Sequence, residues 1–219
     1  MKLATYKDGS RDGQLVVVSR DLRLAHYATG IASRMQQVLD DWSFIAPQLQ
    51  DLYHDLNTGR APHAFAFDST QCMAPLPRAF HWAEGQAYTA HTVLTQPDST
   101  PSRTEPAVRQ GAGDALVGAC DEVPVPSAAL GIDFGAGWAV IASELPRGSN
   151  ADMALANIRL VMLKNTLHLR NVPPESVNST VATAFSPVAG TVDELGDAWK
   201  NGCVHLPLHG SWNGRNVGM

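Results

Sequence analysis

The pattern of hydrophobic and polar positions predicts that the chain opens with a β-hairpin followed by two helices. Apolar residues dominate 2–6 and 13–19, and the segment between them, KDGSRDG, is rich in the Asp and Gly of tight turns. Residues 33–42 repeat apolar positions at helical spacing, and a second helix is predicted over 44–57, where NTGRAP ends it. Together these elements predict a small α/β unit at the N-terminus.

Strand-like segments prevail after a proline-containing crossover at 68–80, so we place a domain boundary near residue 73. A small N-terminal α/β domain would then occupy 1–73, and a β-rich domain would occupy 74–219. Within the second domain, 97–131 is rich in proline and glycine and predicts a long loop. The expected fold class is therefore α+β.

The stretch GIDFGAGWAVI, residues 131–141, reads as a strand with an unusual feature. Gly135 and Gly137 lie two positions apart, so both fall on the same face of the strand. Glycine weakens a strand interior and usually marks a bulge or a place where another group approaches the backbone closely. A short helix at 150–158 and a second long strand at 159–169 are predicted to follow.

Composition narrows the classes of function. Only 17% of the 219 residues are charged, the net charge is −5, and basic residues form no cluster, so we expect no nucleic-acid partner. No apolar run approaches the ~18 residues of a membrane span, and no signal-peptide core is visible. Three scattered cysteines without a CxxC pair indicate neither a zinc cluster nor a disulfide framework. We therefore expect a cytoplasmic protein with no membrane partner.

The segment HWAEGQAYTAH, residues 81–91, offers the first candidate chemistry. It places Glu84 and His91 seven residues apart, with Tyr88 between them. A carboxylate and an imidazole could act there as a metal ligand and a general base. A surface Glu and a hydrogen-bonded His fit the same pattern, so the segment alone does not decide. The sequence has no GxSxG elbow, so acyl-enzyme chemistry is not supported.

Five segments spread along the chain carry a resemblance to a known family. They are MKLATYKDGSRDGQLVVVSRDL, PLPRAFHWAEGQAYTAH, GIDFGAGWAVI, IRLVMLKNTLHLRN and ATAFSPVAGTVDELGDAW. In this order they resemble bacterial proteins of the fumarylacetoacetate hydrolase family. The resemblance implies a small N-terminal domain, a second domain of rolled β-sheets, and a dimer. Family members continue beyond the segment that matches GRNVGM, so the resemblance also implies a C-terminally truncated rolled sheet.

The resemblance further implies a chemistry. Proteins of this family act on 2-oxo acids and 1,3-dicarbonyls by hydrolysis of a C–C bond, hydration or decarboxylation. Acidic side chains hold a divalent cation, such as Mg²⁺ or Mn²⁺, which binds the oxo and carboxylate oxygens of the substrate. A histidine activates the attacking water in the hydrolases.

At the positions that match the family's metal ligands and catalytic histidine, the chain has only some of the expected residues. Glu84 and His91 match the first acidic ligand and the catalytic histidine, so they are the catalytic candidates. The two carboxylates of the family's Glu-x-Glu strand motif fall on Gly135 and Gly137. The last acidic ligand, an Asp, falls on Thr166. Three of the four expected carboxylates are therefore absent at the matching positions.

Two further residues are assigned to the expected substrate pocket. Tyr88 lies between the catalytic candidates, and Arg109 stands where the family has a tyrosine near the substrate. The family's substrate-facing lysine, which precedes the segment matching ATAFSPVA, has no counterpart here because that loop is shorter.

A rebuilt metal site is an additional prediction. On an ideal strand Asp133 shares the face of Gly135, and His168 shares the face of Thr166. Asp133, His168 and Glu84 could then supply new ligands, whereas one carboxylate alone would not hold a divalent cation tightly.

Three interpretations of function follow. In the first, which we adopt, the chain is a degenerate family member that has lost metal-dependent hydrolysis and binds a partner, either a second copy or a full-length paralogue. In the second, a metal-independent enzyme uses His91, polarised by Glu84, for enolisation, cyclisation or decarboxylation of a 1,3-dicarbonyl or small oxo acid. In the third, an ordinary family hydrolase uses a rebuilt metal site. Whether the chain is an enzyme stays open at this point.

Overall fold

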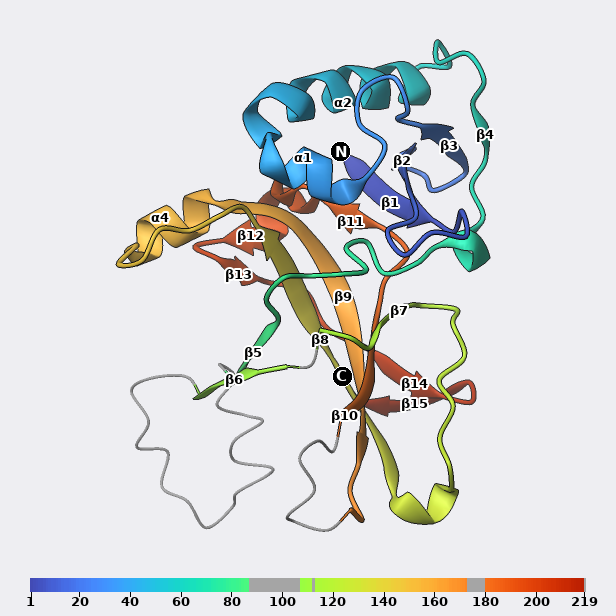
Figure 1. Cartoon of the computed structure of the whole chain (residues 1–219), viewed down its shortest axis with the longest axis vertical. Coiled ribbons are helices and arrows are strands. Elements are labelled where there is room, and N and C mark those ends of the chain that lie inside the picture. Colours follow the sequence, from blue (N-terminus) through green and yellow to red (C-terminus); the bar gives the residue numbers. More distant parts are fainter. Residues whose placement is uncertain (87–106, 112, 173–179, 219) are drawn as a thin grey trace. The chain divides into compact units, whose positions relative to one another are not determined.

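A computed structural model describes residues 1–86, 107–111, 113–172 and 180–218 (Figure 1). The chain forms two compact units. One consists of Met1–Pro77 together with Leu116–Met219, and the other consists of Arg78–Ala115.

The protein is α+β and is mostly sheet with few helices, as expected. The described helices are α1 (Met35–Asp40), α2 (Trp42–Asn57) and α4 (Ala151–Ala156), with short 3₁₀ helices at Ser69–Gln71, Ala128–Leu130 and Val192–Ala198. The strands are β1 (Lys2–Tyr6), β2 (Gln14–Val18), β3 (Leu24–Tyr27), β4 (Phe65–Ala66), β5 (Ala83–Gln86), β6 (Ala107–Gln110), β7 (Leu116–Gly118), β8 (Ile132–Ala142), β9 (Ile158–Leu169), β10 (Thr180–Phe185), β11 (Ala189–Gly190), β12 (Trp199–Lys200), β13 (Cys203–Val204), β14 (Gly210–Trp212) and β15 (Arg215–Gly218). The predicted N-terminal hairpin is confirmed as β1 and β2, which pair antiparallel.

The two predicted N-terminal helices are confirmed, but their ends differ from the expected ones. The side chain of Gln37 accepts hydrogen bonds from the backbone N–H groups of Ser33 and Arg34, at 2.8 and 3.2 Å. The Gln37 side chain therefore reaches back over the start of α1, which has Arg34 as its N-cap and begins at Met35. Asp41 leaves the helical conformation, with φ −135° and ψ 53°, so α2 begins directly after it at Trp42.

The N-terminal core lies on both faces of the first strands. Four successive residues of β1 and of β2 are buried, because α1 and α2 cover one face (Figure 1). The helix α2 contributes a stripe of buried side chains, which are Ile45, Leu49, Tyr53 and Leu56. The other face packs a cluster of buried side chains, which are Ala4, Tyr6, Val16, Val18, Ala25 and Cys72.

One sheet joins the beginning of the chain to its later part. Among the described residues it has nine strands in the order β4-β3-β2-β1-β11-β9-β10-β7, with β8 on the other edge of β9. The link is the antiparallel pairing of Lys2 with Gly190 and of Leu3 with Ala189. The domain boundary near residue 73 stays a prediction.

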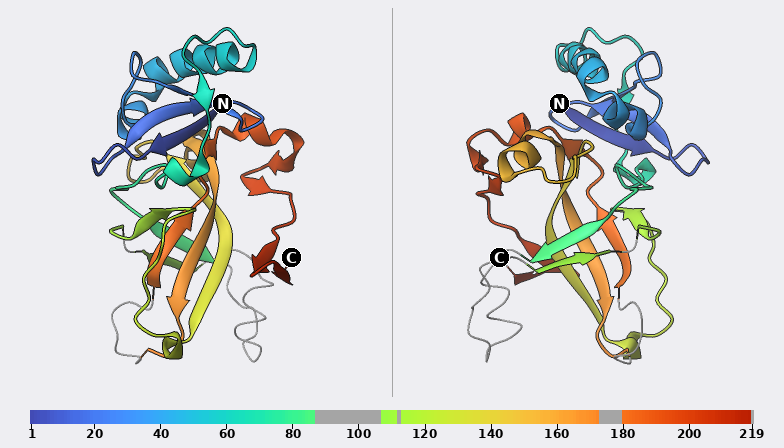
Figure 2. Two further views of the ribbon diagram at one scale, coloured as in Figure 1. Left: turned by 90° about the vertical axis from the view of Figure 1, so that its right-hand side faces the viewer. Right: turned by 60° about the vertical axis from the view of Figure 1, so that its left-hand side comes forward.

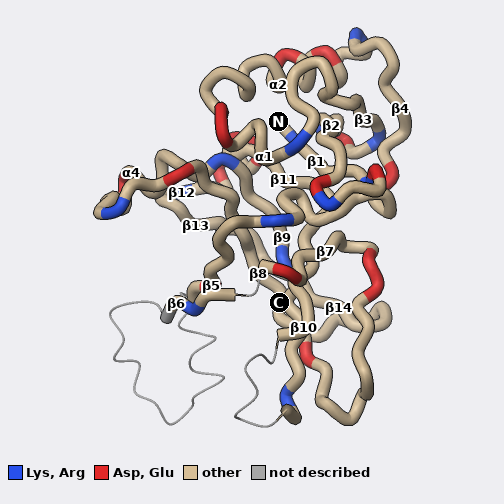
Figure 3. Tube along the Cα trace, viewed as in Figure 1, with Lys and Arg blue, Asp and Glu red and all other residues tan. Residues whose placement is uncertain are grey.

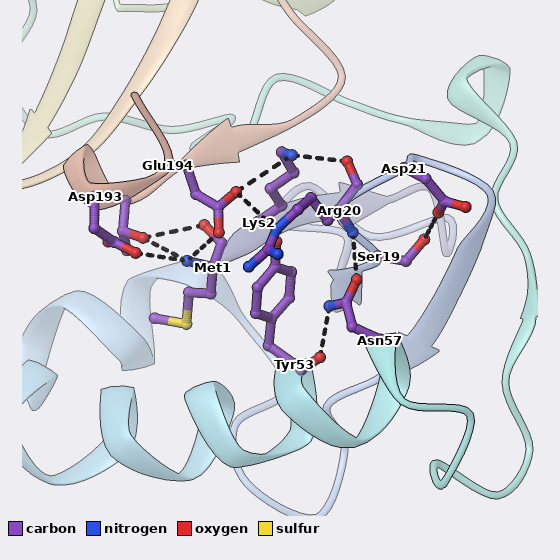
Figure 4. Close-up of polar contacts among 10 residues, drawn as sticks. Met1, Lys2, Ser19, Arg20, Asp21, Tyr53, Asn57, Asp193 and Glu194 are labelled. Carbon is purple, nitrogen blue, oxygen red and sulfur yellow. Dashed lines mark hydrogen bonds and ion pairs between the residues drawn. The ribbon is translucent and has the colours of Figure 1, made fainter. Parts of the chain in front are cut away.

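A cluster of charges reinforces the link (Figure 4). The N-terminal ammonium of the buried Met1 donates to Thr191 Oγ1 at 2.5 Å and lies 3.1 Å from Glu194 Oε1. Lys2 Nζ lies 3.4 Å from the other oxygen of Glu194. Burial alone would raise the pKa of Glu194, but the neighbouring Tyr53 hydroxyl and these two cations outweigh it and hold the pKa below its usual range.

The two longest strands, β8 and β9, run antiparallel beside each other over their whole length (Figure 2). Each confirms a strand predicted from the sequence, and α4 lies between them in the chain. Their side chains alternate between two faces. One face continues the buried core through Ala139, Ile141, Leu160 and Met162. The site described below lies further along this same face.

The smaller unit contains the antiparallel pair β5–β6, in which Ala83 lies opposite Gln110. After β6 the backbone N–H of Gly111 donates to the carbonyl of Trp82 at 2.9 Å. Basic and acidic residues are interspersed along the trace (Figure 3). Within the described parts of the chain, no helix has the length and apolar character needed to cross a bilayer.

Candidate functional site

The register of β8 and β9 places the residues singled out from the sequence on one sheet face. Gly135 lies directly opposite Thr166. Two residues away on either side, Asp133 lies opposite His168 and Gly137 lies opposite Lys164. Directly opposed residues of an antiparallel pair share a face, so the shared face inferred from strand alternation is confirmed.

The change from core to polar site occurs at Gly137 and Lys164. On one side of this pair the same face is buried and apolar, with Ala139 and Met162 as the next opposed pair. On the other side it carries hydroxyl, imidazole and carboxylate groups. The strands thus position the polar groups rigidly, because they extend the same two strands that form the core.

The side chain of Lys164 fills the space that Gly137 leaves. A Cβ atom at position 137 would lie 3.2 Å from Lys164 Cε and 3.7 Å from its Cγ. At position 135, by contrast, the nearest atom to such a Cβ is the Thr166 carbonyl oxygen, 3.9 Å away. One of the two glycines therefore accommodates a lysine stem, and the other leaves open space on the face.

Two buried threonines lie beside this lysine. Lys164 Nζ donates to Thr166 Oγ1 at 3.0 Å. Thr166 is 1% exposed and Thr183 of β10 is 2% exposed, and their hydroxyl oxygens lie 3.3 Å apart. An ammonium only donates, so Thr166 Oγ1 accepts from it and can donate its own proton to Thr183.

Farther along the face, the remaining polar groups are engaged with neighbours. His168 Nδ1 lies 3.3 Å from Thr180 Oγ1. Asp133 Oδ2 accepts from Arg170 Nε at 2.7 Å and from its Nη2 at 2.5 Å. These hydrogen bonds from Arg170 hold the pKa of Asp133 below its usual range.

The other predicted site residues lie in the smaller unit or outside the described residues. Glu84 on β5 faces Arg109 on β6, with Glu84 Oε2 3.9 Å from Arg109 Nη2. The Glu84 side chain is 14% exposed, whereas that of Arg109 is mostly exposed. Tyr88 and His91 lie outside the described residues.

The groups at the glycine-bearing face do not fit the divalent cation that the family resemblance implies. Gly135 and Gly137 offer no ligand atom, and the hydroxyl at Thr166 accepts from an ammonium, which repels cations. Within the described ranges, no three His, Cys, Asp or Glu side chains are grouped as a metal site would require. The rebuilt site stays a prediction, although Asp133 is already paired with Arg170.

Sequence reasoning missed two members of this site. Lys164 could have been found, because it lies two residues before Thr166 and so falls on the same strand face. Thr183 could not, because its place beside Thr166 depends on the pairing of β10 with β9.

Comparisons with known proteins identify the class to which this fold belongs. Residues 1–78 match the family model described as "Fumarylacetoacetase N-terminal domain 2". A candidate HpcE protein from Mycobacterium smegmatis has a similar structure, with 18% identity and a TM-score of 0.67, over 90% of this chain and 68% of that one. Maleylpyruvate hydrolase from Sphingobium sp. SYK-6 is also similar, with 16% identity and a TM-score of 0.60, over 90% of this chain and 70% of that one.

A comparison with curated proteins by sequence finds no match. The two structures establish the fold as that of fumarylacetoacetate hydrolase-type proteins. The sequence match of the first 78 residues to a fumarylacetoacetase N-terminal domain agrees with the family resemblance predicted from the sequence.

Proposed function

We propose that this chain is a member of the fumarylacetoacetate hydrolase family that does not catalyse metal-dependent C–C bond hydrolysis and acts instead by binding a partner protein. The observation that supports the proposal is the position of Lys164. Its stem lies over Gly137 and its ammonium binds Thr166, where the family resemblance leads us to expect carboxylates around a cation.

The repulsion between the Lys164 ammonium and a divalent cation can be estimated. At an effective dielectric constant of about 20, a divalent cation ~4 Å from an ammonium is repelled by about 8 kcal/mol. Carboxylates normally supply the compensating charge, and neither Gly135, Gly137 nor Thr166 has one. Binding of Mg²⁺ or Mn²⁺ on this face would therefore require Lys164 to move away.

The opposite face of β8 and β9 supports the binding role. It presents apolar side chains to solvent, including Val140 and Leu163, which are 44% and 42% exposed. Trp212 of β14 stacks on Phe134 of this face and is itself 53% exposed. Contiguous exposed apolar area commonly marks a protein interface, and the proposed partners are a second copy or a longer family member.

Calorimetry with Mg²⁺ and Mn²⁺, combined with assays on acylpyruvates and oxaloacetate, tests the loss of metal chemistry. We expect neither saturable heat nor turnover from the wild-type protein. A variant that carries Gly135→Glu, Gly137→Glu, Thr166→Asp and Lys164→Val together is the matched control, because it restores three carboxylates and removes the ammonium. Metal binding with turnover by the wild type would overturn the proposal.

Light scattering after size-exclusion chromatography tests the binding role. Leu163→Lys, on the apolar face, should reduce self-association or binding to a longer family member. Lys200→Met, on the exposed end of β12, is a control that leaves this face unchanged. A wild-type chain that stays monomeric and does not bind a longer family member would contradict a role in assembly.

A metal-independent enzyme remains the alternative. It is favoured by Glu84, whose largely covered carboxylate lies opposite Arg109 and could orient a neighbouring base. The base assigned to it, His91, lies outside the described residues. His91→Ala should abolish turnover of a 2-oxo acid or 1,3-dicarbonyl substrate if this alternative holds, and unchanged turnover would eliminate it.

A further inference from the structure

We propose that Asn213, in the turn between β14 and β15, is a site of spontaneous deamidation, and that its isoaspartyl product releases Trp212 from Phe134. The inference goes beyond the proposed function and does not depend on it. It follows from a difference in surroundings between two turns that have the same sequence.

The two Asn-Gly pairs of the sequence, Asn201–Gly202 and Asn213–Gly214, occupy equivalent turns. Each is the two-residue loop of a hairpin, the first between β12 and β13 and the second between β14 and β15 (Figure 1). All four residues have positive φ, between 47° and 77°, as a type I′ turn requires. Asparagine followed by glycine is well suited to deamidation, because glycine has no side chain to shield its own nitrogen and moves freely between backbone conformations.

The reaction at Asn213 needs only water. The backbone nitrogen of Gly214 attacks Cγ of Asn213, a C–N bond closes a five-membered succinimide, and the side-chain nitrogen leaves as ammonia with the proton that the backbone nitrogen loses. Water then adds to one ring carbonyl and breaks its bond to the ring nitrogen. Opening at Cγ gives aspartate, whereas opening at the backbone carbonyl gives isoaspartate, whose main chain is one methylene longer. Each product gains a carboxylate, and no atom is oxidised or reduced.

The two turns differ in what packs against them. A Cβ at Gly202 would lie 2.5 Å from Leu155 Cδ2, so this side chain of α4 covers the first turn. A Cβ at Gly214 would meet no atom of the described residues within 4 Å, and residues 211–217 are all exposed. Closing the ring requires the glycine nitrogen to swing toward the asparagine side chain, which distorts the turn. The uncovered turn opens more readily, so Asn213 should react before Asn201.

The turn at 213–214 positions Trp212. This residue pairs with Arg215 across the loop, and its ring stacks on Phe134 of β8, with ring centroids 5.5 Å apart and ring planes at 13°. The geometry of the turn sets the register of a hairpin, so an extra methylene in the loop shifts Trp212 relative to Arg215. Isoaspartate at 213 should therefore release the ring from Phe134. Aspartate at 213 leaves the main chain unchanged and should preserve the stack.

Mass spectrometry of the full chain, aged at pH 8 in water enriched in ¹⁸O, tests the site. Water opens the ring, so each event leaves a heavy oxygen in the modified peptide. We expect label at Asn213 to accumulate at least about fivefold faster than at Asn201. Leu155→Ala uncovers the other turn and should bring the rate at Asn201 close to that at Asn213. In concentrated urea both sites of the wild type should react at similar rates, which keeps the test decisive if Leu155→Ala fails to fold.

The indole N–H resonance of Trp212, assigned with Trp212→Phe, reports on the stack. It should move in the isoaspartyl fraction and stay near its wild-type position in Asn213→Asp. An unchanged resonance in the isoaspartyl fraction would overturn the release of Trp212. Four results would overturn the site itself: no label at Asn213 in the native protein, equally fast label at Asn201, a preference for Asn213 that persists in urea, or an unchanged rate at Asn201 in a folded Leu155→Ala chain.

Discussion

Lys164 and Gly137 lie directly opposite each other on β9 and β8, and the lysine stem occupies the space into which a side chain at 137 would extend. The equivalent space at Gly135 is open. Two glycines that look identical in the sequence therefore have different surroundings, and this difference can be measured.

Alanine should raise the stability of the protein at position 135 but not at position 137. Gly135→Ala removes the entropic cost of glycine without a steric conflict, so it should raise the free energy of unfolding by about 0.5–1 kcal/mol. Gly137→Ala also removes the entropic cost of glycine, but it forces Lys164 to shift, because the new Cβ would lie 3.2 Å from the Cε of Lys164. Urea unfolding should therefore give the order Gly135→Ala above wild type and Gly137→Ala at or below it. The reverse order would contradict the packing described.

The two buried threonines should behave as a coupled pair. Thr166→Val keeps the shape of the side chain but leaves Lys164 and Thr183 each without a buried hydroxyl partner, at a cost of about 1–3 kcal/mol. Thr183→Val should cost less, because Thr166 still accepts from the lysine. In the double variant both members are apolar, so the loss should be smaller than the sum of the single losses. Strict additivity in urea unfolding would show that the hydroxyls do not interact.

Most of the fold could be predicted from the sequence, and the reasons are local. The hairpin of β1 and β2 follows from two apolar runs around an Asp- and Gly-rich turn, and the strands β8 and β9 follow from long apolar segments around a short helix. The start of α1 was missed because it depends on one side chain, Gln37, which bonds to the backbone ahead of the helix.

Only those parts of the site that follow from side-chain alternation within one strand could be predicted from the sequence. Alternation placed Asp133 with Gly135, and His168 with Thr166, on common faces. Only the register between strands reveals that Gly137 lies opposite Lys164, and only the pairing of β10 with β9 brings Thr183 to Thr166. Such contacts between distant parts of the chain leave no periodic signal in the sequence.

Glu194 should make stability depend on pH. Its pKa is lowered in the folded state, so its contribution is fully present above the unfolded value near 4.5 and is lost as the pH falls through the folded value. Glu194→Gln should cost about 1–3 kcal/mol at pH 7, because it leaves the ammonium of the buried Met1 with a weaker partner. The difference from wild type in urea unfolding should shrink below pH 4.5. A difference that stays constant from pH 7 to pH 3 would exclude this role.

The three cysteines should divide into two classes of reactivity. Cys120 and Cys203 are exposed, whereas Cys72 is buried in the N-terminal core. Burial, with a smaller effect of the Asp68 carboxylate, raises the pKa of Cys72 to about 12 and suppresses its thiolate. Ellman's reagent should therefore modify two thiols in the native protein and the third only on unfolding. Cys72→Ala is the control and should abolish only the modification that appears on unfolding, whereas rapid modification of all three thiols in the native protein would contradict the buried position.

The lysine that covers Gly137 also limits how the chain could change in evolution. A single substitution to glutamate at 137 would place the new carboxylate beside the ammonium of Lys164, where the two groups would form an internal ion pair. Such an intermediate would gain no cation-binding ability, so selection for metal chemistry could not favour it until Lys164 was also replaced. A glutamate at 137 would therefore be useful for metal binding only if Lys164 were replaced as well.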